Sequence, residues 1–325
     1  MSTIRWGIIG CGDVTEVKSG PALQQAEHSN LVAVMRRNGT LARDYAARHG
    51  VPRWYDDAQA LIDDPEVDAV YVATPPDTHQ LYTLRAAQAG KPVYVEKPMA
   101  LNFAECQAMV DACAAAGVPL FVAFYRRALA RFLKIKELVE TGVIGQVRLV
   151  NITYHHPLRP AELNRETLPW RVRPEIAGGG HFVDLAAHML DFLDYVFGPI
   201  QQVQGFAANQ AGRYPAEDIV TGSFVFVSGV LGAGTWCFTT ADRRDHTEIV
   251  GDAGRLEYAT FDASPLVLTT AAGRSELAYA YPAHIQQPLI QTIVDALNGH
   301  GECPSTGVSG ARTTWVMEQM LKAHV

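Results

Sequence analysis

Up to about residue 123, short apolar runs alternate with stretches in which apolar residues recur at helical spacing. The runs are mostly apolar throughout rather than alternating, as expected of strands that are covered on both faces. They are IRWGII (4–9), LVAVM (31–35), DAVYVAT (68–74), PVYVEKP (92–98) and VPLFVAF (118–124). This strand–helix repetition predicts a parallel, doubly wound Rossmann sheet of the α/β class.

Residues that start and end helices frame the expected helical stretches. TLARDYAARHG ends at Gly50, a residue that favours the left-handed conformation found at helix C-termini. Asn102 followed by Glu105 resembles a capping box, and the helix that it opens would end at Gly117. We therefore expect helices between the strands of this sheet.

The pattern changes after Phe124. RFLKIKELVETG (131–142) predicts a helix, and a loop with four prolines later leads into a second helical stretch at 177–198. Longer runs with partial period-2 alternation predict a large, open-faced and mostly antiparallel sheet in an α+β domain. These runs lie at 146–156, 201–210, 219–229, 230–240, 246–252, 254–261, 265–273 and 275–281, and two helices, near 285–298 and 309–323, follow. We predict a dinucleotide-binding domain of residues 1–123 and a substrate-binding and oligomerisation domain of residues 124–325.

Composition narrows the function classes. The 27 basic and 34 acidic residues give a net charge of −7, which argues against a nucleic-acid partner, since such a partner favours a basic face. No apolar run reaches the ~18 residues of a membrane span, and the opening MSTIRWGIIGCG enters a strand without a leader-like stretch. The five scattered cysteines include no CxxC and are typical of reduced thiols. We expect a cytoplasmic protein that acts on a small molecule.

The stretch GIIGCGDVT (7–15) follows the first predicted strand and opens a helix. Gly10 permits the tight turn of the phosphate fingerprint, and Gly12 lets the backbone approach a pyrophosphate at the helix N-terminus. The third glycine of the fingerprint is replaced by Thr15. We predict a dinucleotide site at Gly10, Cys11, Gly12, Asp13 and Val14, and an ordinary tight turn is the alternative.

The residues after the second predicted strand bear on the choice of cofactor. Sites for NAD often place a carboxylate there, whereas arginine accommodates the 2′-phosphate of NADP. Here Arg36 and Arg37 occupy these positions, 24 and 25 residues beyond Gly12. Two guanidiniums suit a phosphate dianion. We therefore expect NADP in preference to NAD, and a solvated basic turn is the alternative.

The helical stretch AGGGHFVDLAAHMLDFLDYVFG (177–198) combines three glycines with four polar residues. At 100° per residue, His181, Asp184, His188 and Asp191 fall within an arc of roughly 80°. The stripe has three interpretations: a metal site, a structural helix whose polar groups bond to neighbouring backbone, or an acid/base site. We expect no metal, because no HExxH pattern and no further ligand cluster accompany these residues.

Three motifs make a family resemblance specific: ATPPDTH (73–79), VEKPMAL (95–101) and GGGHFVDLAAH (178–188). With the glycine turn, their order and spacing resemble the glucose–fructose oxidoreductase, inositol dehydrogenase and rhizopine catabolism (Gfo/Idh/MocA) family along essentially the whole chain. The resemblance implies NAD(P)-dependent hydride transfer to or from a secondary alcohol or ketone. It also implies a homodimer or homotetramer formed through the C-terminal sheet.

The same resemblance implies the catalytic residues. Lys97 would lie near the nicotinamide and the substrate hydroxyl, where partial desolvation beside a cation would lower its pKa. His188 would exchange a proton with the substrate hydroxyl, and Asp184 would orient the imidazole or bind an adjacent hydroxyl. His181 and Asp191 do not match catalytic positions and are expected to bond locally or border the cleft.

Further positions are implied to line the sites. Glu96 would meet the nicotinamide ribose, and Thr74, Pro75 and His79 would line the path of the cofactor, although His79 could equally be a helix-start residue without a ligand. The resemblance implies substrate contacts for Tyr125, Arg126, Trp170, Arg171, Asp184 and His188. An interdomain salt bridge is an open alternative for Arg126 and for its neighbour Arg127.

The sequence thus predicts an NADP-preferring oxidoreductase of a sugar, an inositol or a related polyhydroxylated ring. One alternative is a dinucleotide-binding sensor without catalysis, but a sensor has no need of the proton relay that Lys97, Asp184 and His188 would form. A second alternative is a dehydrogenase of a non-sugar ring such as a dihydrodiol. Apolar residues in the pocket would favour the dihydrodiol, and charged residues would favour sugars.

Overall fold

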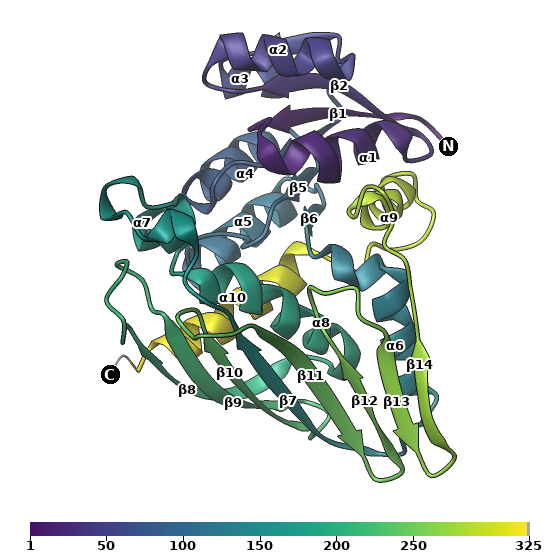
Figure 1. Ribbon diagram of the computed structural model, residues 1–325. Helices are drawn as coiled ribbons and strands as arrows, with labels where there is room; N and C mark the ends of the chain where they lie inside the picture. The colour runs from purple at the N-terminus through teal and green to yellow at the C-terminus, as the bar shows by residue number, and fades with distance from the viewer. Residues whose placement is uncertain (324–325) are drawn as a thin grey trace. The chain divides into compact units, whose positions relative to one another are not determined.

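The computed structural model describes residues 1–323, which form two compact units (Figure 1). The first unit comprises Met1–Leu129 and Pro282–Ala311, and the second comprises Ala130–Tyr281 and the chain from Arg312 onward. The segment 282–311 was expected in the second domain, but it packs within the first. Helix α9 (Gln287–Leu297) contacts α1 (Gly20–Gln25), and Gln286 accepts a hydrogen bond from the hydroxyl of Tyr94 at 2.8 Å.

The first unit contains the predicted parallel sheet. Its six strands run in the order β3-β2-β1-β4-β5-β6, and every neighbouring pair is parallel. Five strands coincide with the predicted apolar runs; the sixth, β3, lies at the edge and was missed, since its three residues are not buried and form no apolar run. The strands are β1 (Ile4–Ile9), β2 (Ser29–Met35), β3 (Arg53–Tyr55), β4 (Ala69–Val72), β5 (Val93–Val95) and β6 (Leu120–Val122).

Helices pack on this sheet between the strands. α1 and α2 contact β2, α3 contacts β1, and α4 contacts β4 and β5. The predicted cap of α5 is present, because the side chain of Asn102 accepts a hydrogen bond from the backbone N–H of Glu105 at 2.9 Å. The remaining helices of the first unit are α2 (Gly39–His49), α3 (Ala58–Ile62), α4 (His79–Gln88) and α5 (Phe103–Ala115).

The second unit contains the predicted open-faced sheet. Its eight strands run in the order β14-β13-β12-β11-β7-β10-β9-β8, and all pairs are antiparallel except β10 with β7. Helices cover one face: Phe132 of α6 packs edge-on against Phe192 of α8, and Trp236 of β10 packs against Phe182. The strands are β7 (Val147–His155), β8 (Ile200–Ala208), β9 (Ile219–Phe226), β10 (Leu231–Cys237), β11 (Arg244–Gly251), β12 (Gly254–Tyr258), β13 (Leu266–Thr270) and β14 (Gly273–Leu277). The helices are α6 (Ala130–Glu140), α7 (Pro174–Ala177), α8 (Ala187–Phe197) and α10 (Gly307–Leu321). Only the part of α10 from Arg312 onward belongs to this unit.

The predicted helix at 177–198 is not a single α-helix. Phe182–Ala186 form a π-helical turn, and α8 begins only at Ala187. A π-turn contains more residues than an α-turn, so the assumption of 100° per residue fails between His181 and His188. The polar residues of the stripe are buried and do not face solvent, since each is at most 8% exposed: His181, Asp184, His188 and Asp191.

Short helical turns shape the segment between β7 and the π-turn. Three 3₁₀ turns, at Pro160–Glu162, Arg165–Thr167 and Trp170–Val172, precede α7. Beneath them lies a small core of Val172, Tyr214 and Ala216, on which Leu158 and Leu168 pack. We call residues 157–176 the substrate-domain loop. Among residues 1–323, no helix has the length and apolar character needed to cross a bilayer.

Candidate functional site

The predicted phosphate loop has the geometry of a tight turn after β1. Gly10 has a φ of 95°, and a Cβ atom there would lie 2.7 Å from Cγ2 and 2.9 Å from the backbone nitrogen of Thr74. A Cβ atom on Gly12 would meet nothing closer than the carbonyl oxygen of Gly10, at 3.9 Å. The protein itself therefore requires glycine at Gly10, whereas at Gly12 it leaves open a space of the kind a phosphate fills.

The first helical turn presents backbone donors at this loop. Asp13 and Val14 stand where N–H groups have no acceptor within the helix, which is the arrangement that binds phosphate. Thr15 replaces the third glycine; its hydroxyl lies 3.0 Å from the backbone nitrogen and 2.8 Å from the carbonyl oxygen of Gly12. A π-turn (Thr15–Ser19) precedes α1, and the hydroxyl of Tyr45 donates to the carbonyl oxygen of Thr15 at 2.8 Å. These residues fit a bound dinucleotide.

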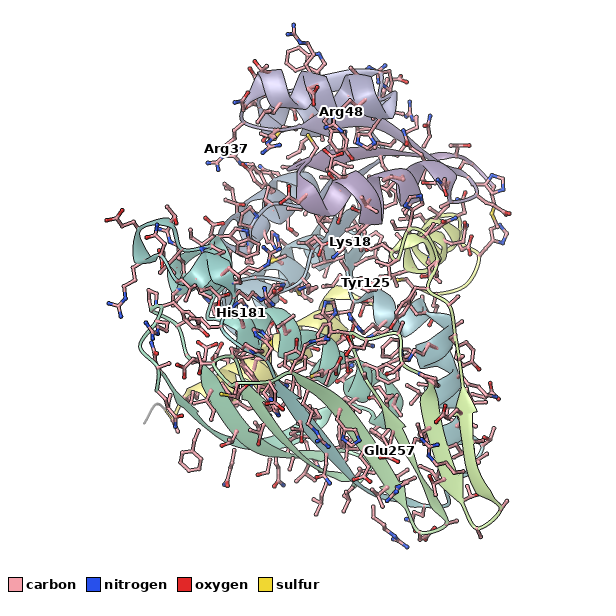
Figure 2. All side chains as sticks on the ribbon, in the orientation of Figure 1. Lys18, Arg37, Arg48, Tyr125, His181 and Glu257 are labelled. Carbon is pink, nitrogen blue, oxygen red and sulfur yellow. The ribbon has the colours of Figure 1, made fainter. Side chains whose placement is uncertain are left out.

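Arg36 and Arg37 follow β2 directly, and both are exposed. The guanidinium of Arg36 reaches the carbonyl oxygen of Cys11 at 3.5 Å, which places it beside the phosphate loop. The side chain of Arg37 extends from the first unit (Figure 2). Neither residue at the end of β2 is a carboxylate, so this position favours an anionic group.

His79 joins the ends of β4 and β5. Its Nε2 lies 2.7 Å from the carbonyl oxygen of Thr74, and its Nδ1 lies 3.0 Å from that of Pro98. The ring is only 1% exposed, and burial lowers its pKa, although the nearby carbonyl groups oppose that shift. Of the two predicted roles, this geometry fits the helix-start residue: His79 braces the segments that carry Thr74, Pro75 and Lys97 rather than facing a ligand.

The carboxylate of Glu96 is engaged within the first unit. Its Oε1 accepts hydrogen bonds from the hydroxyl of Tyr71 and from Nε2 of Gln286, both at 2.6 Å, and its Oε2 accepts one from the backbone N–H of Lys97 at 3.1 Å. Glu96 therefore orients the backbone from which Lys97 projects. Its predicted contact with a nicotinamide ribose stays a prediction. Lys97 is partly exposed and is followed by a cis peptide bond to Pro98.

Tyr125 and Arg126 lie in a 3₁₀ turn (Tyr125–Ala128) after β6. Both are buried, and the guanidinium carbon of Arg126 lies 5.1 Å from the centre of the Tyr125 ring. Arg127 donates to the carbonyl oxygen of Pro304 at 3.0 Å, a contact within the first unit. The substrate contacts of Tyr125 and Arg126 stay predictions.

In the second unit, the structure joins three predicted site residues, Trp170, Arg171 and Asp184, through a chain of contacts. Nε of Arg171 lies 3.4 Å from Oδ2 of Asp184, and the guanidinium of Arg171 stacks over the indole of Trp170 at 4.4 Å. His188 follows Asp184 by four residues, and its imidazole packs edge-on against Phe261 at 5.9 Å between ring centres. The neighbourhood thus offers a charged pair, an imidazole and two aromatic faces.

The other two residues of the stripe bond to side chains that lie 19 and 122 residues away in the sequence. His181 lies 2.6 Å from Glu162 through its Nε2, and the side chain of Asp191 accepts from the hydroxyl of Thr313 at 3.4 Å. Within the part of the chain that the structure describes, no three His, Cys, Asp or Glu side chains are arranged to hold a metal ion.

The glycine entry to the π-turn is held by a carboxyl group that the sequence did not single out. Oε1 of Glu217 accepts from the backbone N–H of Gly180 at 2.8 Å, and a Cβ atom on Gly180 would lie 2.8 Å from Cβ of Ala216. Burial raises the pKa of Glu217 to about 7, and the charge of Asp218 adds to the shift. Glu217 and Gln286 lie far from their partners in sequence, so no local pattern could reveal them.

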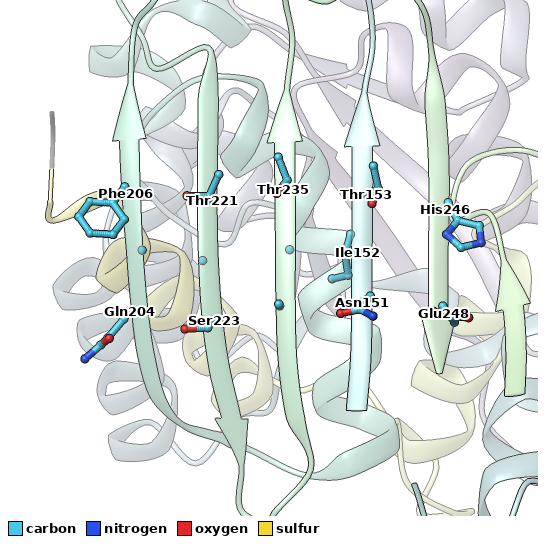
Figure 3. Close-up of a pocket in the computed structure, with 14 residues that line it drawn as sticks. Asn151, Ile152, Thr153, Gln204, Phe206, Thr221, Ser223, Thr235, His246 and Glu248 are labelled. Atoms are coloured by element: carbon cyan, nitrogen blue, oxygen red, sulfur yellow. The ribbon is translucent and has the colours of Figure 1, made fainter. Parts of the chain in front are cut away.

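The uncovered face of the second sheet is hollowed along its middle strands (Figure 3). Its centre is built from small and polar residues, and the edge strand β8 contributes Phe206, which is 63% exposed. The hollow is lined by Asn151, Ile152, Thr153, Gln204, Gly205, Phe206, Thr221, Gly222, Ser223, Ala233, Gly234, Thr235, His246 and Glu248. None of these residues was predicted to act in catalysis, and the face is too open for a small substrate to be enclosed.

Known proteins resemble both units. Residues 4–124 match the Gfo/Idh/MocA oxidoreductase family with its NAD-binding Rossmann fold, and residues 132–257 match the Gfo/Idh/MocA C-terminal domain. Oxidoreductase P35 of Formosa agariphila is 39% identical over 317 residues, which is 98% of each chain. A 1,5-anhydro-D-fructose reductase of Ensifer adhaerens is 30% identical and covers 94% of this chain and 92% of its own. The crystal structure of an aldose–aldose oxidoreductase from Caulobacter crescentus aligns with a TM-score of 0.86 at 26% identity, over 98% of this chain and 96% of that one.

Substitutions of the two glycines of the phosphate loop should cause different defects. Gly10→Ala should lower stability by about 1–3 kcal/mol, because its Cβ would overlap Thr74 in a left-handed backbone. Gly12→Ala should change stability by less than about 0.5 kcal/mol yet weaken binding of the dinucleotide by roughly tenfold or more. Denaturant unfolding and fluorescence titration with reduced cofactor measure the two effects. Unchanged cofactor affinity in Gly12→Ala would refute the assigned phosphate site.

The raised pKa of Glu217 predicts that the free energy of unfolding depends on pH. A carboxyl group whose pKa is higher in the folded than in the unfolded protein stabilises the fold below about pH 4.5, and this contribution is lost as the pH rises through about 7. Glu217→Gln keeps an acceptor for Gly180 and cannot ionise, so at pH 8 it should be more stable than the wild type by about 1–3 kcal/mol. Thermal unfolding of the wild type and of Glu217→Gln at pH 5 and pH 8 measures this difference in stability. Glu302→Gln, at an exposed position, is the control. An equal loss of stability between pH 5 and pH 8 in the wild type and in Glu217→Gln would contradict the prediction.

Proposed function

The chain belongs to the Gfo/Idh/MocA oxidoreductase family, and we propose that it is an NADP-preferring dehydrogenase or reductase of a polyhydroxylated ring. The substrate would be a secondary alcohol or ketone of a sugar, an inositol or a related compound. The observation that carries this proposal is the pairing of Arg171 with Asp184 in the substrate domain, four residues before His188 in the sequence. A charged pair and an imidazole suit a ring with several hydroxyl groups.

The surroundings of His188 also bear on the choice between sugars and dihydrodiols. Asp184 and Arg171 can exchange hydrogen bonds with hydroxyl groups, and the indole of Trp170 can stack on the apolar face of a sugar ring. An aromatic dihydrodiol has only two hydroxyl groups, so it would exchange fewer hydrogen bonds with these polar groups than a sugar does, at a cost in binding free energy. Two relatives, the anhydrofructose reductase and the aldose–aldose oxidoreductase, are named for sugar substrates. We therefore favour the sugar class.

In the proposed mechanism, the bound nicotinamide supplies or accepts a hydride at its C4 atom. His188 takes the proton of the substrate hydroxyl during oxidation and returns it during reduction. Lys97 is the candidate acid/base group of the first unit, and Glu96 and His79 keep its backbone in place. Asp184 orients the imidazole or binds the neighbouring hydroxyl. The alcohol thus loses one hydride and one proton, and the carbonyl product forms.

The preference for NADP rests on Arg36 and Arg37. The position of Arg36 beside Cys11 brings a guanidinium close to where the adenosine ribose follows the pyrophosphate in this fold. A 2′-phosphate there would gain charge-assisted hydrogen bonds, and no carboxylate at the end of β2 repels it.

We also propose a homodimer or homotetramer that forms through the uncovered sheet face. Alternating residues of β10 place Leu231, Ala233 and Thr235 on this face, and Leu231 is 57% exposed. Small side chains allow two sheets to approach closely, and Leu231 and Phe206 supply apolar area. Light scattering on the wild-type protein measures the assembly, and a monomeric mass would overturn this proposal.

Substitution of the relay residues tests the mechanism. On a substrate that the wild-type protein oxidises, Lys97→Met and His188→Asn should each lower kcat by roughly 10²–10⁴-fold, the usual contribution of general acid–base catalysis. Affinity for NADPH should change little in His188→Asn, because His188 belongs to the substrate domain. Steady-state kinetics and cofactor titration measure both, and wild-type turnover in either variant would refute the relay.

Arginine substitutions test the choice of cofactor. Arg36→Ala and Arg37→Ala should weaken NADPH binding by about 10- to 100-fold and leave NADH binding nearly unchanged, since only NADPH carries the phosphate. Fluorescence titration of each reduced cofactor measures the dissociation constants. Arg43→Ala, an exposed arginine on α2, is the matched control. Tighter binding of NADH than NADPH by the wild-type protein would exclude the NADP preference.

A further inference from the structure

The substrate-domain loop (157–176) carries Trp170 and Arg171, and a buried pair that the proposed chemistry does not use ties it to the start of the π-turn. Nε2 of His181 lies 2.6 Å from Oε1 of Glu162, and both side chains are at most 1% exposed. Oε2 of Glu162 accepts from the backbone N–H of Arg159 at 3.0 Å. Both carboxylate oxygens are therefore committed to holding the loop.

This pair lies at the base of the loop. The ring of His181 packs against those of His156, Tyr214 and Phe238, with centres 5.4–5.9 Å apart. Within the described chain, Glu162 is the only hydrogen-bond partner of the His181 side chain, because Nδ1 is buried and has none. The aromatic contacts hold the ring of His181 in place, and Glu162 provides its hydrogen bond.

Glu162 is held as a carboxylate in this setting. Burial acts to raise its pKa, but the hydrogen bonds from His181 and from the backbone of Arg159 outweigh burial, and the net result is a lowered pKa. A buried charge with a single side-chain partner is costly to leave alone, so the loop and His181 are expected to stay together.

His181 immediately precedes the π-turn that carries Asp184. The loop meets that turn a second time where Arg171 pairs with Asp184 at 3.4 Å. The side chain of Arg171 is 44% exposed, and an exposed ion pair contributes little to the ordering of a loop. The arrangement of Arg171 against Asp184 therefore depends on the buried parts of the loop, which are the small core around Val172 and the contact between Glu162 and His181.

We propose that Glu162 and His181 are positioning residues: their contact seats the substrate-domain loop so that Arg171, which stacks on Trp170, lies against Asp184. The pair itself touches no substrate. This inference rests on the proposed function for its effect on turnover, but its effect on the order of the loop can be measured without any substrate.

Two substitutions at His181 separate the hydrogen bond from the packing. His181→Phe keeps an aromatic ring, larger than imidazole, and removes the donor, whereas His181→Gln keeps an N–H donor on a side chain without a ring. His181→Phe should raise the KM for substrate roughly tenfold or more, since small misplacements of binding groups have large kinetic effects. His181→Gln should stay within about threefold of the wild type, and NADPH affinity should be unchanged in both. Glu175→Gln, on an exposed residue of the same loop, is the matched control.

Hydrogen–deuterium exchange gives a readout that does not depend on activity. In His181→Phe, exchange within residues 157–176 should rise, while the strands of the second sheet stay protected. Glu162→Leu provides a second variant in case His181→Phe fails to fold; it should change exchange in the same direction because it removes the acceptors for both Arg159 and His181.

A double-mutant cycle distinguishes positioning from a general loss of stability. If the pair seats Arg171, then Arg171→Ala should lower kcat/KM less in the His181→Phe background than in the wild type. Additive effects, or wild-type KM and exchange in His181→Phe, would overturn the inference. A wild-type protein that turns over no polyhydroxylated ring would instead contradict the proposed function, and the exchange result would still decide whether the pair orders the loop.

Discussion

Buried backbone groups that leave regular structure must still find hydrogen-bond partners, and in this protein side chains supply them at several segments of the candidate site. Glu96 holds the backbone of Lys97, and His79 spans the carbonyl groups of Thr74 and Pro98. The same arrangement recurs in the second unit, where the carboxylates of Glu217 and Glu162 accept hydrogen bonds from the backbone N–H groups of Gly180 and Arg159. The residues proposed to meet ligands are thus placed by neighbours that do not.

Because the residues that place the site differ from the residues proposed to meet ligands, only some parts of the molecule could be predicted from the sequence. Apolar runs encode strands locally, so both sheets follow from the pattern, and the Asn102 cap follows from two residues three apart. The edge strand β3 was missed because an edge strand needs little burial. The parallel pairing of β10 with β7 was missed because strand direction depends on connections across the sheet.

The candidate site shows the same limit. Gly10 and Gly12 could be found because their spacing reflects local backbone geometry, whereas Lys97 could be found because the motif around it resembles that of the family. The supporting groups Gln286, Glu162 and Glu217 act across 190, 19 and 37 residues, so only the folded chain reveals them. The stripe on the helix at 177–198 was predicted with a constant turn angle, and the π-turn before α8 changed that angle. His181, which was set apart from Asp184 and His188 in the sequence, bonds to Glu162.

The central claim is that this chain moves a hydride between NADP and a hydroxyl-bearing carbon of a polyhydroxylated ring. The most direct test measures reduced nicotinamide formed by the wild-type protein with a panel of sugars, inositols and dihydrodiols, each with NADP and with NAD. The account predicts turnover on at least one sugar or inositol, and faster turnover with NADP than with NAD. Turnover only on dihydrodiols, or none with any compound while the dinucleotide still binds, would contradict it.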